Sequence, residues 1–163
     1  MEADMLVRLY NIDQDEVRQL EKELFEKEIY IKKVLTSDMT PVVNFVKETF
    51  RQSWADEAMK GVLANKCYVA VKNQEIIGFC CYDISQLDIL GPIGVRPDCR
   101  EKGIGKILAL KSLLSMKELG YAYAIIGWTG PQEFYSKACG AVVIEDSIPK
   151  SHSNKLRIVP EKI

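Results

Sequence analysis

Apolar residues recur along the chain with the periods of helices and of strands in turn. Over residues 16–28 they follow helical spacing among Glu and Lys residues, which predicts an amphipathic helix. Two apolar runs joined by the polar residues 72–75 predict a β-hairpin. Residues 121–128 are nearly all apolar, which is typical of a central strand buried on both faces. The chain is therefore expected to contain both kinds of element.

The complete pattern predicts an α/β domain of mixed α+β type, with a central twisted mixed sheet and helices on both faces. Strands are expected at residues 6–10, 29–35, 67–71, 76–82, 87–95, 121–128, 142–145 and 156–159. Helices are expected near residues 16–28, 41–50, 53–65, 104–119 and 132–139. The strand–helix–strand unit of residues 87–128 should be a right-handed crossover. No repeat or linker divides the 163 residues, which favours a single domain over residues 1–163.

Composition narrows the function classes. The net charge of −1 gives no support for binding nucleic acid or a membrane surface through bulk charge. No apolar run approaches the roughly 20 residues that cross a bilayer, and residues 1–4 are acidic, unlike a signal peptide. The five cysteines form no Cys-x-x-Cys pair, and the single histidine, His152, lies in a polar stretch. We therefore expect a cytoplasmic protein with reduced thiols and with no metal, nucleic-acid partner or membrane partner.

One stretch, residues 90–106, carries the clearest chemistry. An apolar strand ends at Val95, and Pro97 prevents its continuation because proline has no N–H for the ladder. Gly103 and Gly105 then stand at the start of a long apolar helix, where they leave backbone N–H groups uncovered. The helix dipole and three cations favour an anion there: Arg100, Lys102 and Lys106. The turn is therefore predicted to hold phosphate.

Counting excludes two common phosphate loops. A Walker A loop would match residues 105–106, but Arg100 occupies its first glycine position and Ile107 its magnesium-binding hydroxyl position. A dinucleotide-binding fingerprint would match both glycines, but Leu108 occupies its third glycine position. The missing hydroxyl also argues against a nucleotide hydrolase.

The remaining pattern, Arg-x-x-Gly-x-Gly over residues 100–105 directly after a strand and a proline, resembles the acetyl-coenzyme A (acetyl-CoA) signature of the GNAT acyltransferases (Gcn5-related N-acetyltransferases). The order of elements from about Ile29 onward resembles that family too, as do Gly78-Phe79 in a strand and the helical segment 134–141. In that segment Ala141 stands where the family has Phe. Residues 1–28 lie outside the resemblance, as a strand–helix extension before a core at 29–163.

The resemblance implies a GNAT fold with a site for acetyl-CoA as co-substrate. The loop amides would take the cofactor pyrophosphate, and the exposed backbone of the family's fourth strand would pair with the pantetheine arm. The residues that match these positions are Ile93, Gly94, Val95, Arg100, Glu101, Lys102, Gly103, Ile104, Gly105 and Lys106. Gly91-Pro92 is expected to bend that strand. Many members carry Asn just after the fifth strand, where this chain has Trp128-Thr129-Gly130-Pro131.

Tyr135 matches the family's general acid, whose phenol donates a proton to the coenzyme thiolate as an amine attacks the acetyl thioester. The alternative for Tyr135 is a core tyrosine on the apolar side of its helix. Four carboxylates are candidates for the base that removes the amine proton: Glu57, Asp83, Asp88 and Glu133. A cysteine acyl-enzyme would instead use Cys80, Cys81 or Cys139, none of which has a histidine nearby in sequence.

The resemblance predicts an N-acetyltransferase that acts by direct transfer in a ternary complex, on a primary amine of a small molecule or a peptide. The alternative is a non-catalytic module of the same fold that binds or senses CoA, since fold alone does not fix function. Residues 41–65 and 146–155 should shape the acceptor site, and Trp128 either lines it or belongs to the core. Residues 1–28 should pack either on their own domain or on a second copy, which would give a homodimer.

Overall fold

The computed structural model describes residues 3–148 together with 155 and 156. In that part of the chain, seven strands form one sheet in the order β2-β3-β4-β5-β6-β1-β7. The strands are β1 (Ala3–Arg8), β2 (Ile29–Lys33), β3 (Cys67–Lys72), β4 (Glu75–Tyr82), β5 (Ile89–Val95), β6 (Tyr123–Thr129) and β7 (Val142–Val143). The helices are α1 (Gln14–Glu26), α2 (Met39–Thr49), α3 (Gln52–Leu63), α4 (Ile104–Glu118) and α5 (Gln132–Cys139).

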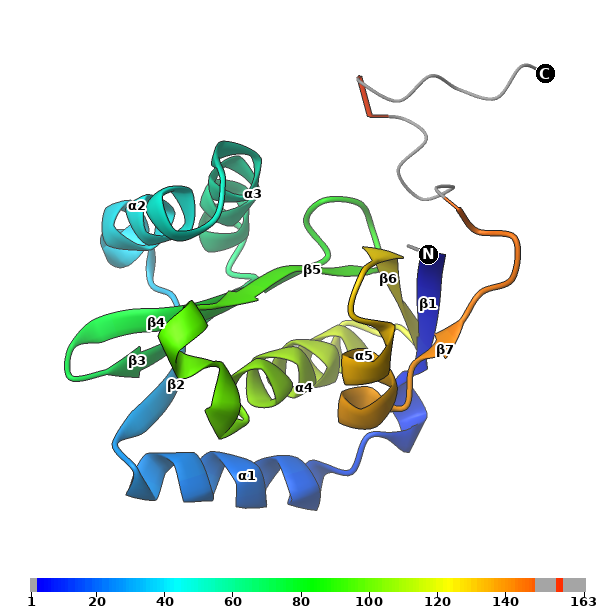
Figure 1. Cartoon of the computed structure of the whole chain (residues 1–163), viewed down its shortest axis with the longest axis horizontal. Helices are drawn as coiled ribbons and strands as arrows, with labels where there is room; N and C mark the ends of the chain where they lie inside the picture. The colour runs from blue at the N-terminus through cyan, green and yellow to red at the C-terminus, as the bar shows by residue number, and fades with distance from the viewer. Residues whose placement is uncertain (1–2, 149–154, 157–163) are drawn as a thin grey trace.

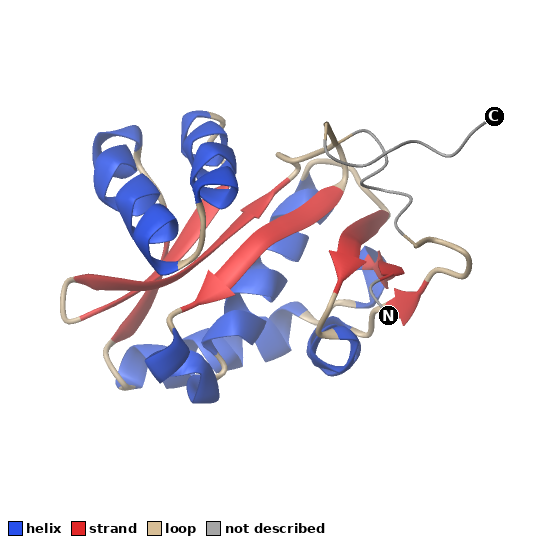
Figure 2. Ribbon diagram, turned by 45° about the horizontal axis from the view of Figure 1, so that its top comes forward, coloured by secondary structure: helices blue, strands red, loops and turns tan. Residues whose placement is uncertain are grey.

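Helices cover both faces of this sheet. Figure 1 shows α2 and α3 on one face and α1, α4 and α5 on the other, and Figure 2 shows the sheet between the two layers. Among the described strands, β5 and β6 run parallel and the other neighbours run antiparallel. The predicted mixed sheet with helices on both faces is therefore confirmed.

Each face of the sheet has its own apolar core. Under α4, the side chains of Ile104, Ile107 and Leu108 are fully buried against the sheet. Under α2 and α3, Val46 and Phe79 are fully buried in a second cluster. The central strands contribute to both clusters, which explains why their sequences are apolar at successive positions.

Two local turns follow from the residues that form them. The β3–β4 hairpin closes at Asn73 and Gln74, whose φ angles of +50° and +64° are those of a type I′ turn. The pairing of β4 with β5 shifts register between Cys80 and Tyr82, opposite the segment that contains Gly91 with φ +118°. The predicted hairpin and the predicted bend in β5 are both confirmed.

The parallel strands β5 and β6 stay together over a short distance only. Their register covers Ile89 with Ile125 and Leu90 with Ile126. Further along, β5 remains paired with β4, as in the contact of Gly94 with Phe79. The two strands diverge beyond this point (Figure 2), so the side of β5 that faces β6 is open over its last residues.

Residues 3–26 are built into the domain. Strand β1 lies between β6 and β7, with Leu6 opposite Ile125 on one side and Val142 on the other. Helix α1 packs beside α4 and buries Val17 and Leu24. In the structure this segment packs on its own domain.

Some predicted boundaries were wrong. The strand expected at 6–10 ends at Arg8, because Leu9–Asn11 turns into a 3-10 helix. The strand expected at 142–145 is limited to Val142–Val143 and pairs with β1. Residues 157–159 of the last predicted strand lie outside the described residues. In the part of the chain that the structure describes, no helix has the length and apolar character to cross a membrane.

Candidate active site

Helix α4 begins at the turn that was predicted to hold phosphate. A 3-10 segment, Pro97–Lys102, leads to Gly103, whose φ of +74° lies in the left-handed region that glycine adopts without strain. Gly103 caps α4 without a side-chain hydrogen bond, so the N–H groups of the first turn are open to a ligand. The turn therefore presents backbone donors and the positive end of the helix dipole to an anion.

Two of the predicted cations lie at this turn. Arg100 donates from Nε to the carbonyl oxygen of Val95 at 3.3 Å, and Lys106 Nζ forms an ion pair with Glu16 of α1 at 3.0 Å. Both side chains line the same groove. The side chains of Glu101, Lys102 and Trp128 lie outside the described part of the structure, although their backbones belong to it.

A groove of about 570 Å³ runs between the α4 turn and α5, and we call it the donor groove. It includes seven of the ten residues predicted to bind the cofactor: Ile93, Gly94, Val95, Arg100, Gly103, Gly105 and Lys106. Its other lining residues are Phe50, Arg51, Trp54, Pro131, Phe134 and Tyr135. The predicted residue Ile104 has a fully buried side chain, so it can offer only its backbone.

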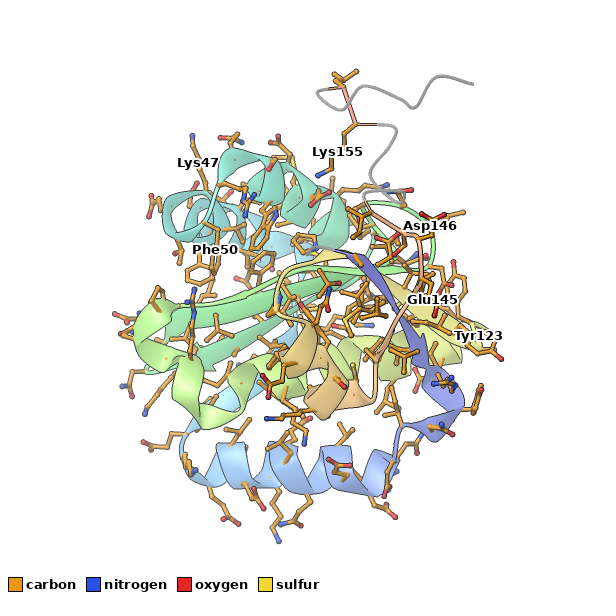
Figure 3. The ribbon with its side chains drawn as sticks, turned by 45° about the vertical axis from the view of Figure 1, so that its right-hand side comes forward. Lys47, Phe50, Tyr123, Glu145, Asp146 and Lys155 are labelled. Atoms are coloured by element: carbon orange, nitrogen blue, oxygen red, sulfur yellow. The ribbon has the colours of Figure 1, made fainter. Side chains whose placement is uncertain are left out.

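Two aromatic rings form walls of the donor groove against glycines. A Cβ atom at Gly94 would lie 2.5 Å from Cζ of Phe50, and one at Gly105 would lie 3.2 Å from Cζ of Phe134. Figure 3 shows Phe50 between the α2–α3 pair and the sheet. The glycines at these positions therefore let aromatic rings approach the backbone of β5 and α4.

A second cavity of about 480 Å³, which we call the acceptor cleft, adjoins the donor groove. Its residues come from the junction of α2 and α3, α3, the loop before β5, β5, β6, the segment from β6 into α5, and the C-terminal segment: Arg51, Trp54, Glu57, Ser85, Ile89, Leu90, Gly91, Pro92, Ile93, Ile126, Gly127, Thr129, Gly130, Pro131, Tyr135 and Lys155. Five residues line both cavities: Arg51, Trp54, Ile93, Pro131 and Tyr135. The donor groove and the acceptor cleft therefore meet where the strands separate.

Tyr135 stands at this meeting point. Its side chain is 6% exposed, and its ring contacts Phe134 edge to face with centroids 5.0 Å apart. Burial raises the pKa of the Tyr135 phenol, and the neighbouring Cys80 and Cys139 add to the effect. The phenol therefore stays protonated at neutral pH, as a proton donor must.

Of the four candidate bases, Glu57 alone is among the described residues that line the acceptor cleft. Asp83 accepts from Lys66 Nζ at 2.7 Å, from the Asp88 N–H at 2.7 Å and from the Tyr121 hydroxyl at 2.8 Å. Glu133 is exposed and pairs with Lys137 at 2.8 Å. Burial raises the pKa of Glu57, so this carboxyl takes up a proton more readily than an exposed carboxyl does.

The three candidate cysteines have the properties of core thiols. Burial raises the pKa of Cys80 to about 12 and that of Cys139 to about 11. A hydrogen bond with Cys67, followed by burial, raises the pKa of Cys81. Protonated thiols are poor nucleophiles, and none of the three is among the described residues of either cavity.

Phe50 and Arg51 lie within residues 41–65, which were expected to shape the acceptor site, but neither was singled out as a site residue. Phe50 directly follows the last residue of α2 and packs its ring on Trp54 and Phe79. Arg51 separates α2 from α3 and lies over the Trp54 ring, with Cζ 4.5 Å from its centroid. The break between two helices was a usable signal, because a loop beside an apolar face often carries functional residues.

Comparison with solved structures places this fold among known ones. A GCN5-related glucosamine N-acetyltransferase region of a fungal multi-domain GH3 β-N-acetylglucosaminidase is similar, with 15% identity and a TM-score of 0.69 over 88% of this chain and 20% of that one. A GCN5-related N-acetyltransferase from Sphaerobacter thermophilus has 17% identity and a TM-score of 0.63 over 87% of this chain and 48% of that one. The chain thus spans less than half of either structure, and at these identities the likeness concerns the fold.

Sequence comparison adds the family. No curated protein is significantly similar to the chain in sequence. The family model described as "Acetyltransferase (GNAT) family" matches residues 33–141, from the end of β2 to the residue before β7. This match covers more than half of the chain and includes the α4 turn and Tyr135. The chain belongs to the GNAT family of acetyltransferases.

Proposed function

We propose that the protein is an acetyl-CoA dependent N-acetyltransferase that acts on a primary amine of a small molecule. The observation that carries this proposal is the meeting of the donor groove and the acceptor cleft at Tyr135. Two substrates bound in these cavities would have their reacting ends beside the same phenol, which favours direct transfer in a ternary complex. The free cysteines, four of them buried and Cys139 partly so, agree with a cytoplasmic location.

The donor would lie along the residues that the sequence indicated. The first-turn N–H groups of Gly103 to Lys106, with Arg100 and residues 101–102, would bind the pyrophosphate. The pantetheine arm would follow Ile93, Gly94 and Val95, where β5 has no pairing with β6. The acetyl group would then reach the junction of the two cavities.

The reaction balances with groups present at the junction. The amine nitrogen attacks the thioester carbon, so a C–N bond forms and the C–S bond breaks as the intermediate collapses. Tyr135 gives its proton to the leaving sulfur, and the nitrogen returns a proton to the phenolate. An ammonium substrate brings one further proton, which must leave before attack because the protonated nitrogen has no free electron pair.

The acceptor cleft favours a small molecule. Its volume of about 480 Å³ lies within the range of about 300–1,000 Å³ that small-molecule sites occupy. The fungal region that shares this fold is named as a glucosamine N-acetyltransferase, which makes an amino sugar the first acceptor to test. A sensor that binds CoA alone would have no use for a second cavity, so the acceptor cleft also favours the enzyme over that alternative.

The test is release of free CoA thiol from acetyl-CoA in the presence of primary amines. The panel should contain D-glucosamine, amino acids, polyamines, arylalkylamines and short peptides, with products identified by mass spectrometry. We expect acetylation of at least one small amine. Binding of acetyl-CoA without thiol release for any amine would overturn the enzyme and support a CoA-binding module.

A further inference from the structure

We propose that Glu57 of α3 is the catalytic residue that binds the acceptor ammonium and removes its proton. This inference rests on the proposed function and adds to it the acceptor side of the mechanism. Glu57 lines the acceptor cleft, and the other three candidate bases are not among the described residues of that cleft.

The helix α3 aims Glu57 at the cleft. Trp54 and Glu57 are three residues apart and so share one side of the helix, and both line the cleft. The neighbouring Asp56 is exposed and bonded to Gln52, whose Nε2 donates to Asp56 Oδ1 at 2.9 Å. The same turn of helix therefore carries one carboxylate toward the cleft and another toward solvent.

The other ionisable groups in the cleft are hydrogen-bond donors. The Arg51 guanidinium and the Lys155 ammonium offer N–H groups and no acceptor atom. The Tyr135 phenol already holds its proton because burial raises its pKa. Glu57 is thus the one ionisable proton acceptor among the described residues of this cavity.

The remaining carboxylates are held elsewhere. Asp83 accepts hydrogen bonds from Lys66, Tyr121 and the Asp88 backbone, and it lines neither cavity in the described part of the chain. Asp88 contributes to neither cavity in the described part of the chain. A base must reach the proton it removes, and this geometry leaves Glu57 as the group that can do so.

The proton path is then complete. The acceptor enters as an ammonium and forms an ion pair with the Glu57 carboxylate. One proton passes from nitrogen to Glu57 and on to solvent, and the freed electron pair attacks the acetyl carbon. Tyr135 serves the sulfur on the other side of the junction. The neutral amide product has no charge for Glu57 to hold, so the product leaves more readily than the substrate.

The charges around Glu57 set its pH dependence. Burial raises its pKa, whereas Lys155 from the C-terminal segment, Lys60 on α3 and Arg51 lower it, and Asp56 raises it slightly. Tyr135 faces the same cavity in its neutral form. Figure 3 shows Lys155 above the end of the sheet and close to α3. Since the base acts when deprotonated, kcat/KM should fall as pH drops through a raised carboxyl pKa.

The test compares Glu57→Gln with Asp56→Asn, which removes the same charge from the solvent side of the same helix. The probe is the panel amine with the highest kcat/KM for the unmodified protein. We expect Glu57→Gln to lower kcat/KM by about 10² and to lose the acidic limb of the pH profile. We expect Asp56→Asn to retain both, with acetyl-CoA affinity unchanged in both variants.

The outcomes separate this inference from the proposed function. If the unmodified protein binds acetyl-CoA and acetylates no amine, the proposed function fails and the base role fails with it. If the unmodified protein is active and Glu57→Gln keeps its rate and acidic limb, or Asp56→Asn loses as much, Glu57 alone is overturned. Should Glu57→Gln fail to bind acetyl-CoA, Glu57→Asp decides, because it should keep the acidic limb at a reduced rate, and full activity or loss of the limb would contradict the role.

Discussion

Lys106 at the start of α4 and Glu16 on α1 form an ion pair of 3.0 Å across 90 residues of sequence. The lysine also lines the donor groove beside the phosphate turn. The N-terminal helix therefore supplies a carboxylate that holds a cation of the proposed cofactor site. An incoming pyrophosphate would have to compete with Glu16 for this ammonium.

Removal of that competition should strengthen CoA binding. We expect Glu16→Gln to lower the Kd for CoA by about twofold to fivefold, because exposed ion pairs are worth up to about 1 kcal/mol. The gain should shrink at high salt, which screens the exposed charges. Titration calorimetry at low and high salt measures both effects.

Glu21→Gln is the matched control for this experiment. Glu21 lies on the same helix and pairs with Lys111 at 2.8 Å, one and a half turns further along α4 and away from the described lining of the donor groove. The Glu21→Gln variant should leave the Kd for CoA unchanged. An equal gain in both variants would mean that helix α1 acts through net charge and not through Lys106.

Tyr135→Phe should separate chemistry from binding. The phenylalanine keeps the ring in its buried place and removes the proton that the leaving sulfur needs. We expect kcat to fall by about 10² or more, while the Kd for acetyl-CoA stays within twofold. Steady-state rates of thiol release and calorimetry give the two numbers. Unchanged turnover would remove Tyr135 from the mechanism and leave it a core tyrosine.

The parts of the site that follow one another in sequence could be predicted from it. The turn at Arg100 and Gly103 could be predicted because few conformations fit a strand followed by a proline and then by two glycines one residue apart. Tyr135 was visible because its helix resembles a family pattern. Both line the donor groove.

The parts assembled by tertiary contacts could not be predicted in the same way. The sequence gives no local signal for the insertion of β1 between β6 and β7, because that pairing joins residues more than 100 positions apart. Glu57 was one of four candidate bases in the sequence, and only the packing of α3 beside β5 distinguishes it from the other three by bringing it to the cleft. An ionisable side chain acquires a special role through such packing, which local spacing does not encode.

Gly94 should be essential to the shape of the donor groove. An added Cβ would lie 2.5 Å from the Phe50 ring, which is itself packed between Trp54 and Phe79 and has little room to yield. We expect Gly94→Ala to destabilise the protein by about 1–3 kcal/mol, as overpacking usually does, and to weaken acetyl-CoA binding. Urea denaturation and calorimetry measure the two losses.

The double variant Phe50→Leu/Gly94→Ala tests whether the clash with the Phe50 ring causes the loss of stability. A smaller side chain at residue 50 should relieve the clash, so the double variant should be more stable than the sum of the single changes predicts. Additive losses would show that Gly94 matters for its backbone and not for the approach of Phe50.

Replacement of Asp88 by Asn should stabilise the protein at neutral and alkaline pH. Asp88 Oδ1 is buried with no hydrogen-bond partner among the described residues, and burial together with the charge of Asp83 raises the pKa of Asp88 to about 6. A carboxyl whose pKa is higher in the folded state than in the unfolded chain lowers stability as pH rises through the interval between the two values, here from about 4 to about 6. Asn is uncharged and tolerates the φ of +63° at this position. We therefore expect Asp88→Asn to gain about 1 kcal/mol in urea denaturation at pH 8, after allowance for solvent screening, and almost nothing at pH 4.

Asp83→Asn is the opposing control, because it leaves Lys66 without its carboxylate and should lose stability at pH 8. An equal gain for Asp88→Asn at both pH values would mean that its charge is not the cause.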